Sequence, residues 1–374
     1  MKITSVKCYP VGVRLKEPLW WGTLRCDVKG GTVVEIQTDE GITGFGEAGF
    51  ASDFFPLVRE LINRDVAPLI VGKDPSNIAA LWQLIFEATH QWGRRGVQTY
   101  ALSGVDTALW DLMGKVAGLP TYKLLGGVKS KVKAYFAPSL KSPDVLVNET
   151  LEAAKQGFEA VKVRITADQT AAVDLVRRIR KELGDSFEIA VDANMAFDRH
   201  AALRLASACE ELGVAWLEEP IRSYSYADYL SEHEWLSHRV GLKISGGEPL
   251  LTRFEYVEPL KRRVFAIIQP DAAAVGGITE CKRVADMADA SRITCIPHVA
   301  CSSGIGIGMS ANLHTILASP NAPMLEFDAY GGAAWEGLLQ EPLKVVGGYV
   351  EAIDRPGLGV DFNPGAVESF ALEF

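Results

Sequence analysis

The chain has 374 residues, of which 48% are hydrophobic and 23% charged, a balance that indicates a globular protein and excludes an extensively disordered one. Its formal net charge of −9 argues against nucleic acid or an anionic membrane as a partner. There is no apolar run of about 18 residues and no apolar segment at the N-terminus, so we expect a cytoplasmic protein without a membrane span or signal peptide. The six cysteines form no Cys-x-x-Cys pair, and we expect reduced thiols rather than disulfides or a zinc site.

Residues 1–125 carry the signals of an α+β domain. Residues 30–50 alternate apolar and polar side chains on both sides of Asp39-Glu40-Gly41, which predicts a β-hairpin. The segment PLWWGTLR, residues 18–25, is interpreted as a loop that either packs between domains or faces a substrate as a lid. Helical periodicity follows in three segments, which are residues 52–70, 75–90 and 97–120.

From residue 126 to residue 349 the pattern changes to short apolar runs that alternate with amphipathic helices. Eight such runs predict parallel βαβ units, which favour a modified TIM-type (β/α) barrel over the alternative of a doubly wound sheet. The tail, residues 350–374, returns to strand and turn residues and is expected to join the first domain. The expected barrel strands are residues 131–137, 159–164, 188–194, 214–219, 242–248, 265–271, 292–298 and 323–327.

Ionisable residues stand at the ends of nearly all these predicted strands. The successive gaps between them are 30, 26, 30, 23, 27 and 28 residues, one βα unit each. Barrel active sites are built at the carboxyl ends of the strands, so we expect these side chains to converge on one mouth. The residues are Lys162, Asp192, Glu218, Glu248, Asp271, His298 and Glu326.

Three carboxylates, Asp192, Glu218 and Glu248, end consecutive strands. Without a cation between them they would repel one another and raise one another's pKa values. A hard divalent metal relieves this repulsion, and ligation by oxygen alone favours Mg²⁺ over zinc. The alternative is that some of these carboxylates pair with nearby cations, namely Lys162, Arg164 or Lys243. Glu219 competes with Glu218, but alternation along a strand predicts that only one of the two reaches the mouth.

Asp271 and His298 end adjacent predicted strands. A carboxylate beside an imidazole fixes its tautomer and raises its basicity, which is the arrangement of a general base near neutral pH. The other five histidines are interpreted as ordinary core or surface residues. On an earlier strand Lys162 and Arg164 are two residues apart and therefore share a face, which predicts an anion between the two cations.

The sequence resembles the mandelate racemase subgroup of the enolase superfamily along essentially its whole length. The resemblance rests on the order and spacing of the motifs KVR, VDAN, WLEEP, GGEPL, QPDAAAVGGIT, PH and LEF. It implies an α+β capping domain followed by a modified barrel. One departure stands out: Arg164 takes the place of the second lysine of the subgroup's K-x-K motif, which would serve as a base on the opposite face.

The resemblance also implies a role for each site residue. Asp192, Glu218 and Glu248 would hold Mg²⁺, and His298 would be the base of a dyad with Asp271. Glu326 would hydrogen-bond the substrate carboxylate as it becomes an enediolate. The positions matching the substrate-contacting residues are Lys162 and Asn194, together with Arg164 in its altered form.

The predicted activity is Mg²⁺-dependent dehydration of a sugar acid to a 2-keto-3-deoxy acid. A racemase needs two bases, and arginine stays protonated, so Arg164 favours chemistry that one base completes. The alternatives are a cycloisomerase, epimerase or racemase acting through the same enediolate, a binding protein without catalysis, and a metal-free phosphate-binding barrel enzyme. We expect a small-molecule carboxylate as substrate and a homo-oligomer; the sequence leaves open which sugar acid is used.

Overall fold

The computed structural model describes the chain except residues 22–23, 50–54, 92, 300–305, 329–336, 340–341 and 371–374. An antiparallel sheet at the N-terminal end is formed by β1 (Ile3–Trp21), β2 (Leu24–Thr38) and β3 (Thr43–Ala48). The predicted hairpin between β2 and β3 is confirmed, and Gly41 in its turn has a φ of 77°. The interpretation of residues 18–25 as a loop was wrong, because β1 and β2 stay paired up to Trp21 and Leu24. Residues 22–23 of that segment lie outside the described part.

Helices cover this sheet where the sequence predicted them. The longest, α4, packs on β3 because Gly46 leaves room: a Cβ there would lie 2.0 Å from the carbonyl oxygen of Gly104. Gly118 ends α4 in the left-handed conformation. The helical elements are α1 (Phe55–Leu61), a π-helical turn (Ile62–Val66), α2 (Ala67–Ile70), α3 (Ile78–Thr89), α4 (Val97–Ala117) and α5 (Thr121–Leu124).

A second sheet contains eight parallel strands, and each begins within three residues of its predicted range. In the described residues the strand order is β10-β9-β8-β7-β6-β5-β4, with β11 paired to the other side of β4, and no ladder joins β10 to β11. The strands are β4 (Lys131–Ala137), β5 (Ala160–Arg164), β6 (Glu188–Asp192), β7 (Trp216–Glu218), β8 (Ile244–Gly246), β9 (Ile267–Ile268), β10 (Thr294–Cys295) and β11 (Met324–Asp328). This arrangement confirms the predicted modified barrel.

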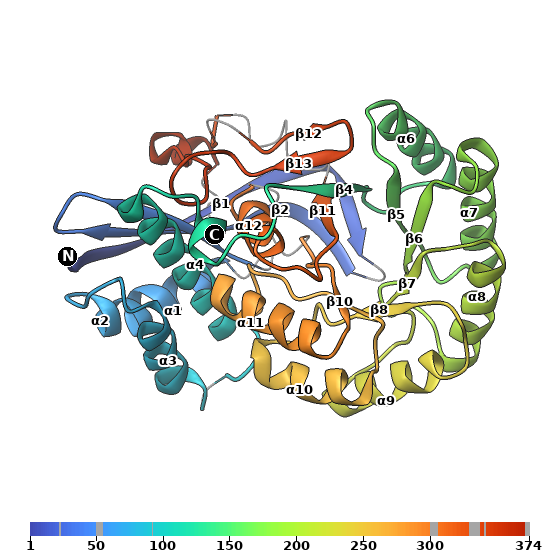
Figure 1. Ribbon diagram of the computed structural model, residues 1–374, viewed down its shortest axis with the longest axis horizontal. Helices are drawn as coiled ribbons and strands as arrows, with labels where there is room; N and C mark the ends of the chain where they lie inside the picture. The colour runs from blue at the N-terminus through green and yellow to red at the C-terminus, as the bar shows by residue number, and fades with distance from the viewer. Residues whose placement is uncertain are drawn as a thin grey trace.

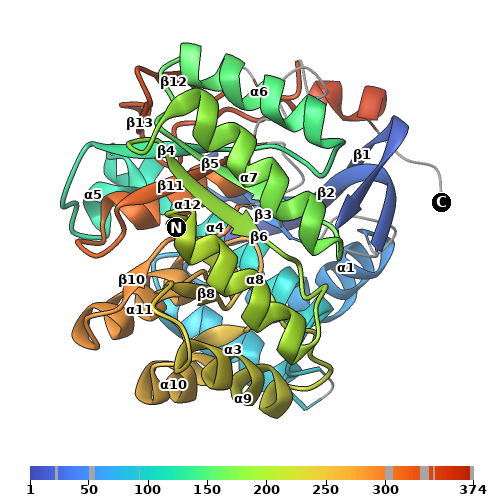
Figure 2. The same ribbon diagram turned by 90° about the vertical axis from the view of Figure 1, so that its right-hand side faces the viewer.

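Helices surround these strands, most of them amphipathic and one, α12 (Ile307–Leu317), buried along its whole length (Figures 1 and 2). Their apolar faces and the outward faces of the strands form the largest hydrophobic core, while a separate cluster that includes Tyr135 and Trp216 fills the interior of the barrel. None of the described helices combines the length and apolar character needed to cross a membrane. The helices are α6 (Pro143–Lys155), α7 (Gln169–Leu183), α8 (Arg199–Glu211), α9 (Tyr226–Ser237), α10 (Thr252–Arg262), α11 (Gly277–Ala290) and α12 (Ile307–Leu317).

The segment from residue 345 to residue 370, which includes most of the predicted tail, contacts both parts of the molecule. Its strands β12 (Val345–Val346) and β13 (Tyr349–Glu351) extend the second sheet, with β13 antiparallel to β4. Beyond them, Phe362 packs its ring against Tyr9 and Phe45 of the N-terminal sheet. A 3₁₀ helix (Pro364–Phe370) follows.

A buried ion pair joins the N-terminal sheet to the barrel. Nζ of Lys29 on β2 lies 2.6 Å from Oδ2 of Asp328, at the end of β11, and both side chains are less than a tenth exposed. We predict that Lys29→Met lowers the free energy of unfolding by about 3 kcal/mol, because removing one partner leaves charge in a desolvated place. The exposed pair of Lys123 and Asp354 offers a control, and Lys123→Met is expected to cost less than about 1 kcal/mol. Equal losses in urea unfolding of the two variants would contradict this prediction.

His314 on the buried helix α12 is held as a neutral ring. The backbone N–H of Tyr122 donates to its Nδ1 at 3.0 Å, so Nδ1 carries no proton, and Nε2 donates to the carbonyl of Leu358 at 3.0 Å. A proton on Nδ1 would place two donors face to face. Burial accordingly lowers the pKa of His314 to about 4.

This lowered pKa predicts that stability falls as the pH drops from about 6.5 towards 4. In that window His314 is protonated in the unfolded chain but neutral in the folded protein. The contribution of His314 to the free energy of unfolding is therefore complete above pH 6.5 and is lost as the pH falls. We expect His314→Gln to reduce the slope of unfolding free energy against pH by up to about 1.4 kcal/mol per pH unit. Urea unfolding between pH 4.5 and pH 7.5, at intervals of about half a unit, measures this slope. An unchanged slope would show that His314 does not titrate as stated.

Candidate active site at the carboxyl ends of the barrel strands

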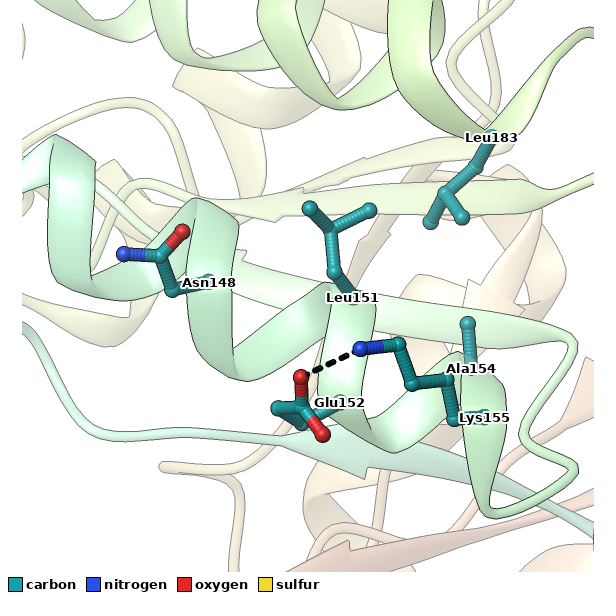
Figure 3. A pocket seen from close by; sticks show the side chains of 6 residues that line it. All are labelled: Asn148, Leu151, Glu152, Ala154, Lys155 and Leu183. Carbon is teal, nitrogen blue, oxygen red and sulfur yellow. Dashed lines mark hydrogen bonds and ion pairs between the residues drawn. The ribbon is translucent and has the colours of Figure 1, made fainter.

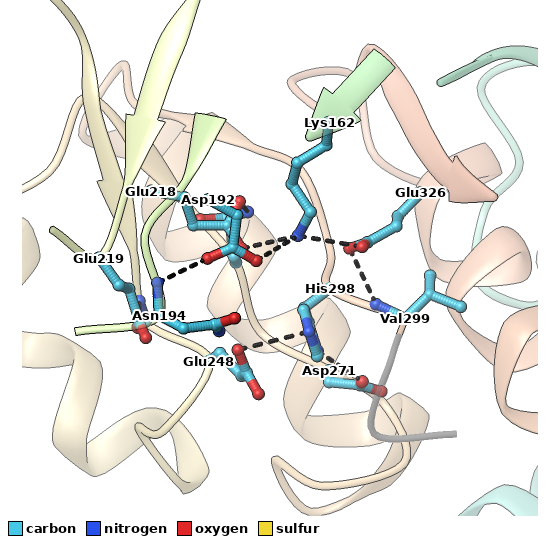
Figure 4. Close-up of polar contacts among 12 residues, drawn as sticks. Lys162, Asp192, Asn194, Glu218, Glu219, Glu248, Asp271, His298, Val299 and Glu326 are labelled. Carbon is cyan, nitrogen blue, oxygen red and sulfur yellow. Dashed lines mark hydrogen bonds and ion pairs between the residues drawn. The ribbon is translucent and has the colours of Figure 1, made fainter. Parts of the chain in front are cut away.

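The parallel register of the strands places the predicted site residues at one level. Arg164 pairs with Asp192, and Asp192 in turn pairs with Glu218, so the charged ends of β5, β6 and β7 are neighbours. Figure 4 shows the side chains of Asp192 and Glu218 close to those of Lys162, Glu248 and His298 at the mouth. All seven predicted strand-end residues are therefore brought together. A hollow elsewhere, between α6 and α7, is lined by Lys155, Glu152 and apolar side chains and gathers no such cluster (Figure 3).

Lys162 lies at the centre of this cluster and is completely buried. Its Nζ is 2.7 Å from Oε1 of Glu218, 3.0 Å from Oε1 of Glu326 and 3.6 Å from Oδ2 of Asp192. Burial alone would lower the pKa of Lys162, but the three carboxylates outweigh it and raise the pKa, so the ammonium keeps its charge. Pairing of carboxylates with Lys162, one of the alternatives for these residues, is thus present in this structure.

Arg164 points into the same cluster from the same face of β5. Its Nε is 3.4 Å from Oδ2 of Asp192, its Nη2 is 3.6 Å from Oε1 of Glu326, and Nη1 donates to the carbonyl of Pro138 at 3.0 Å. Its Nε is buried and donates no hydrogen bond within the described residues. Burial opposes the charge, but these carboxylates raise the pKa of Arg164 further, so this side chain can donate to an anion but cannot accept a proton. Lys243, the third cation considered, is exposed and outside the cluster.

Glu218 and Glu219 have different hydrogen-bond partners. Oε2 of Glu218 accepts a hydrogen bond from Gln269 at 2.6 Å, and burial raises the pKa of Glu218 to about 7. Glu219, just past the strand end with a φ of 40°, accepts hydrogen bonds from the hydroxyl of Tyr229 at 2.5 Å and from the backbone N–H of Gly247 at 3.3 Å. Gln269 is a contact that the sequence reading missed, although it begins the motif QPD.

His298 lies between two carboxylates. Its Nδ1 is 3.1 Å from Oδ2 of Asp271, and its Nε2 is 3.3 Å from Oε2 of Glu248. Since carboxylates accept hydrogen bonds and one faces each ring nitrogen, both Nδ1 and Nε2 carry protons in this arrangement, and Nε2 is the atom that faces the mouth. Burial lowers the pKa of His298, but Glu248, Glu326 and the hydrogen bond to Asp271 together raise it to about 10.

Asn194 and Glu326 complete the predicted set. Asn194 has a φ of 41°, donates its backbone N–H to Oδ1 of Asp192 at 3.0 Å, and has an Oδ1 without a hydrogen-bond partner among the described residues. Glu326 accepts hydrogen bonds from the hydroxyl of Tyr135 at 3.1 Å and from the backbone N–H of Val299 at 3.3 Å. Burial opposes its charge, but Lys162, His298 and Arg164 lower the pKa of Glu326 to about 2.

The oxygen ligands of Asp192, Glu218 and Glu248 are of the kind that binds a hard cation. In this structure, however, two of the three carboxylates contact Lys162. Among the described residues no three His, Cys, Asp or Glu side chains surround a common metal position. Buried oxygens nevertheless point to a missing polar group: Oδ1 of Asn194, Oε1 of Gln269 and Oγ of Ser245 all lack a partner within the described part. Buried oxygens that lack donors, beside three carboxylates, fit a hydrated Mg²⁺ ion.

Comparison with known proteins places the chain in a family. Residues 3–126 match the model of the mandelate racemase / muconate lactonizing enzyme N-terminal domain, and residues 146–366 match the model of the enolase C-terminal domain-like family. The chain therefore belongs to the mandelate racemase and muconate lactonizing enzyme group of the enolase superfamily, as its motifs predicted.

Particular relatives in this group carry named activities. An arabinonate dehydratase of Saccharolobus solfataricus is 35% identical over 341 residues, which cover 90% of this chain and 89% of that protein. A D-galactarolactone cycloisomerase of Agrobacterium fabrum is 29% identical over 387 residues, covering 100% and 99%. The crystal structure of L-talarate dehydratase from Polaromonas sp. JS666, complexed with Mg and L-glucarate, superposes with a TM-score of 0.85 at 29% identity, covering 100% and 98% of the two chains. Mg²⁺ is thus found in this group.

Proposed function

We propose that this protein is a hydro-lyase that dehydrates a sugar acid to a 2-keto-3-deoxy acid. The observation that carries the proposal is a single His298–Asp271 pair facing Lys162 and Arg164, with an arginine where a second base would stand. The arabinonate dehydratase of S. solfataricus supports the assignment, because it is similar over nine tenths of the chain.

The chain's own residues provide the binding step. Lys162 and Arg164 attract the substrate carboxylate, and the Nε of Arg164, which donates no hydrogen bond within the described residues, offers one to it. Asn194 supplies an oxygen to a substrate hydroxyl. Asp192, Glu218 and Glu248 would hold Mg²⁺. When bound, Mg²⁺ makes the proton next to the carboxylate more acidic by stabilising the enediolate, and it offsets the anionic field that raises the pKa of His298.

Proton transfer then follows from the geometry of His298. Nε2 takes the proton from C2 while Asp271 holds Nδ1–H. Lys162 and Arg164 donate to the enediolate oxygens, and Glu326, a carboxylate in this structure, must take up a proton before it can donate to them. The electron pair moves to form a C2–C3 double bond, the C3–O bond breaks, and Nε2–H returns its proton to the leaving hydroxide as water. The enol left behind takes a proton from solvent at C3, releases the proton of its 2-hydroxyl to solvent and becomes the 2-keto acid. One base is enough for every step.

A substrate screen in D₂O tests this proposal. We expect at least one sugar acid to yield a 2-keto acid, detected with semicarbazide, with deuterium at C3 of the product. Exchange and inversion at C2 without keto acid from any substrate would overturn it. Such a result would require a second proton carrier opposite His298.

A cycloisomerase is the second candidate, because the A. fabrum relative matches the whole chain. Cycloisomerisation conserves mass, whereas dehydration removes one water, so mass spectrometry of the products separates the two. We also propose a cytoplasmic homo-oligomer in which residues 1–125 and the tail 350–374 form the capping domain and residues 126–349 the catalytic barrel.

A further inference from the structure

A buried asparagine on α12 contacts the carboxylate that orients His298. Asn312 is fully buried, its Nδ2 donates to Oδ1 of Asp271 at 3.0 Å, and its Oδ1 accepts the backbone N–H of Ala272 at 2.9 Å. This second bond fixes the orientation of the amide, because a flipped amide would set its N–H₂ against the N–H of Ala272 and its oxygen against a carboxylate.

The two carboxylate oxygens of Asp271 therefore have different hydrogen-bond partners. Oδ1 accepts hydrogen bonds from Asn312 and from the backbone N–H of Ala273 at 2.9 Å, while Oδ2 faces Nδ1 of His298 at 3.1 Å. Without the bond from Asn312, the terminal torsion of Asp271 is broad and the plane of its carboxylate less well defined. The plane of that carboxylate in turn sets the direction in which Nε2 of His298 points.

The helix that carries Asn312 is itself firmly held. Near its start the backbone N–H of Gly308 donates to Glu47, a buried residue of β3, at 2.8 Å. Two residues on, Oγ of Ser310 donates to the carbonyl of Leu358 in the tail at 2.6 Å. The amide of Asn312 therefore stands on a helix fixed from both the N-terminal sheet and the C-terminal tail.

We propose that Asn312 is a positioning residue that completes an Asn312–Asp271–His298 chain and acts on the reaction through Asp271. The inference rests on the proposed role of His298 as the base. Asn312 does not touch the substrate, so its loss impairs proton transfer and leaves substrate binding intact. Groups that orient a functional side chain from behind typically contribute about 10- to 100-fold.

The test compares Asn312→Leu with Ser310→Ala, which removes a buried hydrogen bond from the same helix without touching Asp271. We expect Asn312→Leu to lower kcat about 10- to 100-fold with KM nearly unchanged, and Ser310→Ala to leave kcat within about twofold. Asn312→Ser, whose hydroxyl is too short to reach Asp271, serves if the leucine variant does not fold. Equal losses of kcat in the asparagine variants and Ser310→Ala, or none in either, would overturn the proposal.

A second readout needs no turnover. In protein labelled with ¹⁵N-histidine, the Nδ1–H signal of His298, assigned by its absence in His298→Asn, should move or vanish in the Asn312 variants and persist in Ser310→Ala. An unchanged signal in the Asn312 variants contradicts the positioning role. If the wild type dehydrates no sugar acid, the proposed function fails while this spectrum still decides the role of Asn312.

Discussion

Replacing His298 by asparagine is expected to lower kcat for dehydration by about 10² to 10⁴-fold, the usual contribution of a positioned general base. Asparagine keeps a polar side chain of similar reach but cannot take a proton at neutral pH. The same variant should also lose exchange of the C2 proton with D₂O, because both processes begin with transfer to Nε2. Steady-state kinetics and ¹H NMR of the recovered substrate measure the two effects.

His233 provides a matched control for this substitution. It is as buried as His298, but its Nδ1 contacts the carbonyl of Tyr229 rather than a carboxylate of the mouth. His233→Asn should therefore affect stability and leave the C2 exchange rate per folded molecule unchanged. Full exchange in His298→Asn would show that another group is the base, and the proposed chemistry would need a different proton acceptor.

Removal of divalent metal is expected to lower kcat by at least about 10²-fold, and Mg²⁺ should restore it. The physical reason is the charge balance of the mouth, where the described cations Lys162, Arg164 and His298 face five carboxylates, which are those of Asp192, Glu218, Glu248, Asp271 and Glu326. Mg²⁺ should also raise the melting temperature in proportion to its occupancy, because it binds the folded chain. Assays after chelation, followed by titration with MgCl₂, measure both effects.

Asp192→Asn is the variant that links this response to the predicted ligands. It keeps the shape of the side chain but removes one negative charge, so the Mg²⁺ dependence of activity and melting temperature should weaken together. Full activity after exhaustive chelation would contradict the assignment and favour the alternative of a metal-free barrel enzyme.

Much of the architecture was predictable because local patterns carried it. Each barrel strand is a short apolar run between amphipathic helices, and burial on both faces leaves no other place for such runs. The spacing of one charged residue per βα unit also predicted the mouth, since parallel strands bring their carboxyl ends to one edge. For this reason the structure brings together residues that are far apart in the sequence, such as Lys162 and Glu326, whose Nζ and Oε1 lie 3.0 Å apart.

Other features depended on contacts that no local pattern encodes. Residues 18–25 looked like a loop, yet β1 and β2 pair across most of them. The pairs here are between neighbours in the sequence, Leu19 with Cys26, Trp20 with Arg25 and Trp21 with Leu24, and the hydrophobic pattern did not reveal that the two strands run on so far. Tyr135 lies inside β4 rather than at a strand end, so the strand-end rule gave no reason to choose it as a partner of Glu326. Asn312 stands within α12, not at a strand end, so the strand-end rule gave no reason to choose it either.

The sequence by itself determined the fold class, the family and the residues of the mouth, because these follow from periodicity, spacing and motifs along the chain. Only the tertiary structure decided which side chains of the mouth contact one another. Lys162 lies among Asp192, Glu218 and Glu326. His298 lies between Asp271 and Glu248, and Asn312 donates a hydrogen bond to Asp271. The physical reason is that a pKa and the orientation of a side chain depend on burial and on charges within a few ångströms. Those neighbours come from strands and helices far apart in the sequence, and folding alone brings them together.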